Sequence, residues 1–125
     1  MIKTLSIIFG VVFLAVGVLG FVPGITTSDG HLLGLFHVNT LHNVVHLLSG
    51  AVALYAGMTS GEAARWYFRV FGVVYAAVAA LGFVYGDNAI LGLVANNMPD
   101  TLLHVVIAAV ALVLGFGVSQ THATA

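Results

Sequence analysis

The segment FGVVFLAVGVLGFVPG, residues 9–24, recurs as FGVVYAAVAALGFVYG at residues 71–86, with 11 identities in 16 positions. A second pair of segments is aligned at an offset of 58, residues 32–57 with residues 90–115. Self-similarity over this length is typical of repeated units that pack on one another. The sequence therefore predicts a tandem duplication that covers nearly the whole chain.

The composition indicates the class of protein. Apolar residues make up 61% of the 125 residues and charged residues only 6%, and the mean hydropathy is +1.14. So few charges would not keep a domain of this size soluble. Four apolar stretches are each about long enough to cross a hydrocarbon core of roughly 30 Å at about 1.5 Å per residue. These stretches are residues 4–22, 40–57, 66–85 and 101–118.

We therefore predict an all-α fold, a four-helix transmembrane bundle made of two tandem parallel helical-hairpin repeats. It forms a single integral membrane domain over residues 1–125, with repeat one at about residues 5–57 and repeat two at about 67–118. The first apolar stretch follows Lys3 as in a signal peptide, but its near-copy lies in mid-chain and no Ala-x-Ala site follows it. We expect a retained first helix.

The basic residues predict the orientation. Lys3 precedes the first stretch, and Arg65 and Arg69 flank the junction between the second and the third, whereas residues 23–38 and 86–98 contain no Lys or Arg. The positive-inside rule then predicts a multi-pass protein of the cell membrane with both termini in the cytoplasm. The two hairpins would be parallel, related by an axis along the membrane normal.

Each predicted outer loop carries a short apolar element around a glycine, at residues 32–36 and 90–94. The elements are too short to span a membrane, and they suit a turn of helix that lies in the interface or dips into the bundle. They would roof a site at this end. A simple hydrophobic anchor for each loop explains them equally well.

Polar residues follow each outer loop with the spacing of one helical face. Steps of three, four and seven residues place the members of each stripe on one side of a helix. Polar side chains within a membrane span normally face the bundle, so we expect the two stripes to face each other. The stripes are Asn39, His42, Asn43 and His46, and Asn97, Asp100, Thr101 and His104.

Helix capping explains the first members of the stripes. Asn39 and Asn97 suit an N-cap, Pro99 suits a first turn, and Asp100 suits the third position of a capping box. Capping does not explain His46 and His104, which lie one turn further in. One interpretation is a structural hydrogen-bond network that locks the repeats together in an accessory or structural membrane subunit.

A second interpretation is a metal site. His42 and His46 are four residues apart, as are Asp100 and His104, so each helix can offer two ligands from one face. Three imidazoles and a carboxylate suit zinc or copper. The residues expected to support these ligands from behind are Asn39, Asn43, Asn97 and Thr101.

A third interpretation is a b-type haem with His46 and His104 as axial ligands. No arginine on the outer side offers a partner for the propionates, so we rank haem below metal. Close helix packing explains equally well the small residues that would make room for the macrocycle. These small residues are Gly50, Ala53, Ala108 and Ala111.

Other functions have less support. Asp100 within a span would allow a proton or small-solute path, but four helices enclose little lumen, and a pore would require a homo-oligomer. No catalytic constellation is present, so we predict no enzyme. The absence of cysteine excludes thiolate ligands, and a net charge of −1 gives no basis for nucleic-acid binding. His31, His37 and His122 are interpreted as interfacial or solvated.

The run His42-Asn43-Val44-Val45-His46-Leu47-Leu48-Ser49-Gly50, with Asp100-Thr101-Leu102-Leu103-His104, is similar to a known family. The chain resembles small four-helix bacterial integral membrane proteins classed as a domain of unknown function, family 4383 of that series. The resemblance implies a fold and a membrane location. The expected partner is the lipid bilayer, as the apolar composition indicates, and a homo-oligomer or a larger membrane complex remains an alternative. It implies no activity, and it identifies His42, His46, Asp100 and His104 as residues to test.

Overall fold

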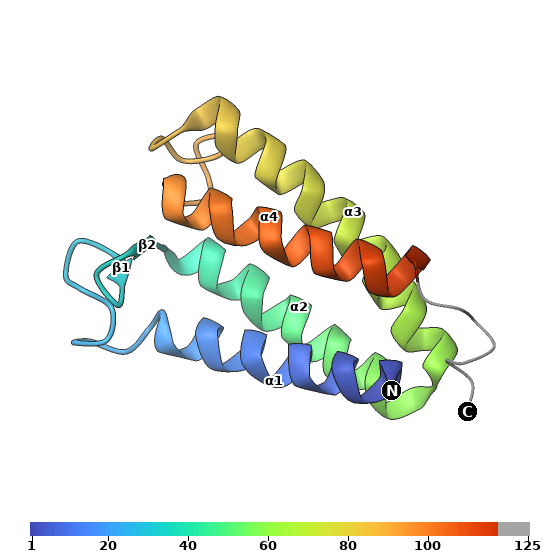
Figure 1. Ribbon diagram of the computed structural model, residues 1–125. Coiled ribbons are helices and arrows are strands. Elements are labelled where there is room, and N and C mark those ends of the chain that lie inside the picture. The colour runs from blue at the N-terminus through green and yellow to red at the C-terminus, as the bar shows by residue number, and fades with distance from the viewer. Residues whose placement is uncertain (118–125) are drawn as a thin grey trace.

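The computed structural model describes residues 1–117, which form an all-α bundle of four long helices (Figure 1). The helices are α1 (Ile2–Leu19), α2 (Thr40–Thr59), α3 (Gly61–Tyr85) and α4 (Met98–Leu112). α4 continues as a turn of π-helix, η1 (Val113–Gly117). The loop between α1 and α2 contains a small antiparallel hairpin of β1 (His31–Leu32) and β2 (Phe36–His37).

All four helices are long and apolar enough to cross a membrane. Their outward faces carry large apolar side chains; Val11 is 55% exposed, Leu48 62% and Val73 55%. Apolar surface on every helix is unfavourable in water and is suited to lipid. The protein is therefore a multi-pass membrane protein, and the predicted four-helix transmembrane bundle is confirmed.

The boundary between α2 and α3 differs from the prediction. α3 begins at Gly61, five residues before the predicted start at residue 66. Ser60 ends α2 and caps α3, since its side-chain oxygen accepts a hydrogen bond from the backbone N–H of Ala63 at 3.0 Å. A serine N-cap allows one extended residue to reverse the chain, so the arginines lie inside α3.

Each hairpin packs closely on itself, α1 against α2 and α3 against α4 (Figure 1). In the first hairpin a Cβ atom on Gly10 would lie 2.7 Å from the backbone nitrogen of Leu54 and 2.8 Å from the carbonyl oxygen of Gly50. The hydroxyl of Ser6 donates to the carbonyl oxygen of Ala53 at 2.7 Å. Small residues therefore bring these two backbones into contact, as in many membrane helix pairs.

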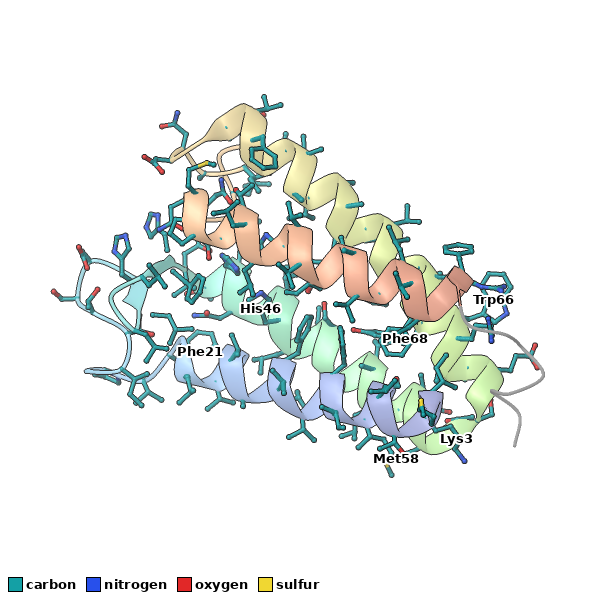
Figure 2. All side chains as sticks on the ribbon, in the orientation of Figure 1. Lys3, Phe21, His46, Met58, Trp66 and Phe68 are labelled. Carbon is teal, nitrogen blue, oxygen red and sulfur yellow. The ribbon has the colours of Figure 1, made fainter. Side chains whose placement is uncertain are left out.

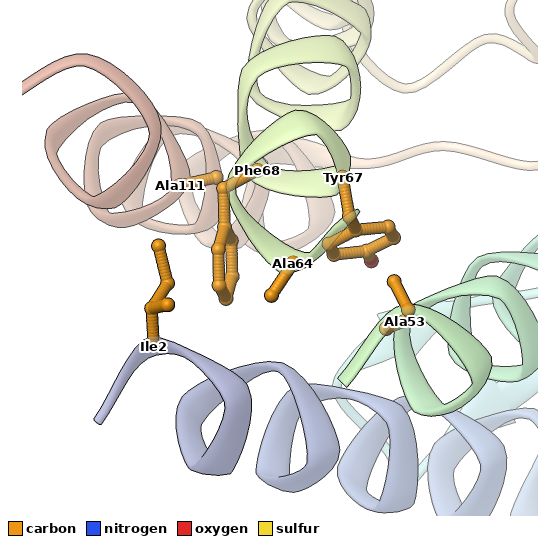
Figure 3. Close-up of a cluster of buried hydrophobic side chains, with 7 residues drawn as sticks. Ile2, Ala53, Ala64, Tyr67, Phe68 and Ala111 are labelled. Carbon is orange, nitrogen blue, oxygen red and sulfur yellow. The ribbon is translucent and has the colours of Figure 1, made fainter. Parts of the chain in front are cut away.

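The two hairpins meet in an apolar core near the chain start (Figure 3). Phe68 of α3 is completely buried there, and its ring meets Phe9 of α1 edge-on with centroids 5.1 Å apart. The other buried members come from all four helices and are Ile2, Ala53, Ala56, Ala64, Tyr67 and Ala111. We call this end, which holds Met1 and the junction at Ser60, the termini end.

The lysine and arginine residues of the chain lie toward the termini end, because Lys3 is near the start of α1 and Arg65 and Arg69 are near the start of α3. Lys3 is seen at this end in Figure 2, and His46 lies toward the other. Arg65 and Arg69 both donate to the carbonyl oxygen of Gly115 in η1, at 3.3 and 2.7 Å. Positive side chains at a helix C-terminus offset the negative end of its dipole. The opposite end, formed by residues 20–39 and 86–97, is called the loop end.

Candidate metal centre

Both helices that start at the loop end are capped by asparagine. The side-chain oxygen of Asn39 accepts from the backbone N–H of His42 at 2.9 Å, and that of Asn97 accepts from Asp100 at 3.0 Å. Asp100 completes a capping box, because its carboxylate accepts from the backbone N–H of Asn97 at 3.2 Å. The predicted caps are confirmed, and we call Asn39, Asn97 and Asp100 the cap layer.

The same asparagines join the two hairpins. The amide nitrogen of Asn39 donates to the carbonyl oxygen of Leu93 at 3.0 Å, and that of Asn97 donates to Leu35 at 2.9 Å. In each capping asparagine, the side-chain oxygen therefore accepts a hydrogen bond from its own helix, and the side-chain nitrogen donates one to the loop of the other hairpin. The two exchanged bonds hold both loops over the helix starts.

The loop segments that accept these bonds are tight turns. Leu33 and Gly34 have φ of 55° and 70°, and Leu91 and Gly92 have φ of 53° and 72°. Two successive residues of positive φ are typical of a type I′ turn. Of the two interpretations offered for residues 32–36 and 90–94, the turn of helix is wrong, because these turns reverse the chain.

Below the cap layer lie three buried histidines, the histidine cluster: His42 and His46 on α2 and His104 on α4. They are 2%, 6% and 4% exposed, and one ring nitrogen from each lies within 4.8 Å of the others. His46 and His104 are each six residues into their helices, or about 9 Å along the axis at about 1.5 Å per residue. The predicted stripes thus bring their histidines together inside the bundle.

One histidine is fixed in orientation by the opposite hairpin. The Nδ1 atom of His42 lies 2.8 Å from the carbonyl oxygen of Ala95. A carbonyl only accepts hydrogen bonds, so Nδ1 carries the hydrogen, and in the neutral imidazole Nε2 then keeps its lone pair. Metal-binding histidines are commonly held in this way by a backbone carbonyl.

The other two histidines have unsatisfied nitrogens. Within residues 1–117, the Nδ1 atoms of His46 and His104 are buried and have no hydrogen-bond partner. Their neighbours are aromatic: the ring of Phe13 lies 5.7 Å from that of His46, and the ring of Tyr75 lies 5.6 Å from that of His104. A polar atom buried without a partner is costly, so these two rings do not form a self-sufficient hydrogen-bond network.

The remaining residues of the predicted stripes lie elsewhere. Asp100 is buried but belongs to the cap layer and is outside the group of three. Asn43 packs against Gly20 of its own hairpin, where a Cβ atom would lie 1.9 Å from the Asn43 side-chain oxygen. Thr101 packs in the same way against Gly82. Both point within their hairpins rather than across the bundle.

Sequence reasoning missed two polar residues beside the histidines. Tyr75 donates from its hydroxyl to the Ser49 hydroxyl at 3.0 Å, and both are buried. Ser49 follows His46 by three residues within an apolar run, and Tyr75 aligns with Phe13 of the first repeat. Each of these two residues has an apolar counterpart in the other repeat. A hydroxyl group present in only one repeat was therefore the signal that could have identified them.

Two apolar grooves run between the hairpins, and both reach the histidine cluster. The groove between α2 and α3, of about 370 Å³, is lined by all three histidines together with Tyr75. The groove between α1 and α4, of about 310 Å³, is lined by His46 alone among the three.

The small residues considered for a haem pocket take part in packing. A Cβ atom on Gly50 would lie 2.8 Å from the backbone nitrogen of Leu14. Ala53 and Ala111 belong to the core at the termini end, and Ala108 packs with Phe13 and Tyr75.

The other histidines lie outside the cluster. His31 and His37 stack in the β1–β2 hairpin with ring centroids 4.7 Å apart, and His31 Nδ1 lies 3.3 Å from the Asp29 carboxylate. The hydroxyl of Thr27 donates to Asp29, which lowers the pKa of that exposed carboxyl group. His122 lies outside the described residues.

Comparison with known proteins identifies the family and no function. No curated protein and no solved structure matches the chain. One family model, described as Domain of unknown function (DUF4383), matches residues 3–117. That match covers both hairpins and the whole histidine cluster. The chain belongs to the DUF4383 family.

Proposed function

We propose that the protein is a membrane metal-binding protein, with His42, His46 and His104 as ligands of one zinc or copper ion. The observation that supports this most directly is the convergence of three buried ring nitrogens within 4.8 Å of one another. Imidazole is a favoured ligand for both metals. The bond from His42 to Ala95 supplies the support that such a ligand needs.

Asp100 has a different role in this proposal. Its carboxylate completes the cap of α4, so we propose it as a support of the helix start rather than the fourth ligand. Asn39 and Asn97 act with it by joining the loops across the site.

A structural subunit without a metal is the second candidate, and the exchanged asparagine bonds favour it, because they lock the hairpins together with no ion. The convergence of one ring nitrogen from each histidine within 4.8 Å of the others favours metal instead. A structural network would also satisfy its own members, whereas among residues 1–117 His46 and His104 each leave a buried nitrogen unpaired. Haem ranks lower because the small residues expected to make room for it contact neighbouring side chains and backbone.

We also propose that the single membrane domain is a tandem duplication with the predicted bounds. Equivalent caps, exchanged bonds and positive-φ leucines at positions 58 apart support this. We propose further that the termini end faces the cytoplasm of the cell, since the three basic side chains of the chain gather there. The histidine cluster would then lie near the outer face.

The test is metal analysis by mass spectrometry on the full chain purified in detergent from metal-replete cells. We expect about one equivalent of zinc or copper per chain. His46→Ala should lose most of it, while His31→Ala, which changes a half-buried histidine of the β1–β2 hairpin outside the cluster, should keep it. Protein that contains no metal, or equal metal in both variants, would contradict the proposal, and a Soret band would indicate haem instead.

A further inference from the structure

The groove between α2 and α3 gives the histidine cluster an opening toward lipid. All three histidines line it. At its rim, Leu48 is 62% exposed and Val74 46% exposed, both on the outward faces of membrane-spanning helices. A molecule that reaches the histidines by this route therefore comes from the hydrocarbon of the bilayer.

The coordination of the proposed metal is incomplete. Zinc in proteins takes four ligands, and sites with three protein ligands keep one position open for an outside molecule. In the described part of the chain, no fourth histidine or acidic residue joins the group of three. The fourth ligand must then come from outside the group, and the groove brings a molecule from the bilayer alongside the three histidines.

We infer that the fourth position is filled from the bilayer by a lipid-soluble phenol or quinol, an aromatic hydroxyl compound with an apolar tail. The inference rests on the metal centre proposed above. The hydroxyl oxygen would bind the ion as the phenolate, with its proton released to bulk water, because metal ligands bind in their deprotonated form and metal binding releases protons.

The lining of the groove favours this chemical class. Phe71 and Tyr75 present aromatic rings that suit a flat head group. The rest of the wall is aliphatic apart from the three histidines and Ser49, so it suits an apolar tail; the aliphatic residues are Val45, Leu48, Val52, Val74, Val78, Ile90 and Val94. A volume of about 370 Å³ is within the usual range of small-molecule sites. An alkyl chain alone would supply no oxygen to the metal.

The experiment uses the full chain in lipid nanodiscs loaded with Co²⁺, whose visible absorption reports a change of ligand. The probes are 4-octylphenol, its methyl ether 4-octylanisole, and phenol without a tail. We expect 4-octylphenol to change the cobalt spectrum saturably. Phenol should bind at least about tenfold more weakly, and the anisole should leave the spectrum unchanged.

Two tryptophan variants place the binding in the groove. Val74→Trp fills the groove and should weaken the binding of 4-octylphenol at least about tenfold. The variant should still bind one equivalent of cobalt. Val73→Trp is the matched control, because Val73 is 55% exposed and does not line the groove. Val73→Trp should bind 4-octylphenol with the same affinity as the unchanged protein.

The possible failures are distinguishable. Cobalt that binds at one equivalent but does not respond to 4-octylphenol would overturn this inference and leave the metal centre standing. An equal response to the anisole, or equal binding by both tryptophan variants, would also overturn it. Failure to bind cobalt would overturn the metal centre and the inference together.

Discussion

The cap layer and the histidine cluster are adjacent polar groups in the same two helices, yet they differ in how their atoms are satisfied. In the cap layer, both asparagines use oxygen and nitrogen in hydrogen bonds, and Asp100 accepts one from Asn97. In the histidine cluster, His46 and His104 have buried nitrogens without partners among residues 1–117. In the proposed function, this difference separates residues that hold the fold from residues that bind the metal.

The largest effect expected from this difference is on metal affinity. His104→Ala removes one of three ligands and should weaken metal binding by at least about 100-fold, beyond the effect usual for a supporting residue. Asn97→Ala should change affinity by less than about tenfold. Titration of both purified variants with zinc and a competing chelator measures this. Similar losses in the two variants would mean that the cap layer and the cluster act as one site.

Metal removal should lower stability only where the cluster is intact. A free metal concentration of about 100 times the dissociation constant stabilises the folded state by about 2.7 kcal/mol. Chelation should therefore lower the free energy of unfolding by about that amount in the unchanged protein and in Asn97→Ala. In His104→Ala it should have almost no effect. Unfolding in mixed detergent micelles with and without chelator is the measurement.

Substitutions in the cap layer should change the free energy of unfolding rather than the metal affinity. Asn39→Ala and Asn97→Ala each remove a cap and a bond to the opposite loop, so each should cost about 1–2 kcal/mol of unfolding free energy. Asn39→Asp is a useful control, because it keeps the capping oxygen and loses the donor to Leu93. Its cost should lie between zero and that of the alanine variant. Unchanged stability in both alanine variants would show that the exchanged bonds are weak.

A smaller effect is expected for Asp100→Asn, which tests whether Asp100 belongs to the cap layer or to the metal ligands. Asp100→Asn keeps an oxygen that can accept from the Asn97 N–H, so stability should fall by less than about 1 kcal/mol. Metal affinity should change by less than about tenfold. A loss of metal as large as that of His104→Ala would identify Asp100 as a ligand.

The smallest effect is expected in the exposed loop. The Thr27 hydroxyl lowers the pKa of Asp29, so this contact stabilises the loop above the ordinary pKa of Asp29. Its contribution is lost as pH falls through the lowered value. Thr27→Val should raise that pKa toward its ordinary value, as measured by NMR titration of the carboxyl carbon. An unchanged pKa would show that the hydroxyl does not stabilise the carboxylate.

Much of the architecture follows from local sequence signals. Hydropathy predicts four spans, and the asparagine caps are visible because Asn97 precedes Pro99 and Asp100 in the order that a capping box requires. The helical spacing of His42 and His46 places them on one face. These features depend on neighbouring residues along the chain, so sequence alone is sufficient to predict them.

Features that depend on distant contacts were missed or mistaken. Leu33 and Leu91 adopt a positive φ, which a leucine seldom does, so the sequence did not indicate these turns and left a turn of helix open. Asn96 is completely buried and donates to the carbonyl oxygen of Gly86 at 2.7 Å. Its counterpart in the first repeat is Val38, so the repeat gave no signal for it. The acceptor of the His42 hydrogen bond is Ala95, whose backbone has no sequence signature.

X-ray absorption spectroscopy of the metal-loaded protein tests the three-histidine centre most directly, because it counts the ligands around the ion. We expect three imidazole nitrogens at about 2.0–2.1 Å from zinc and one further light-atom ligand. The number of imidazoles should fall to two in His104→Ala at saturating metal. One imidazole or none in the unchanged protein, or a first shell made only of oxygen atoms, would contradict the centre.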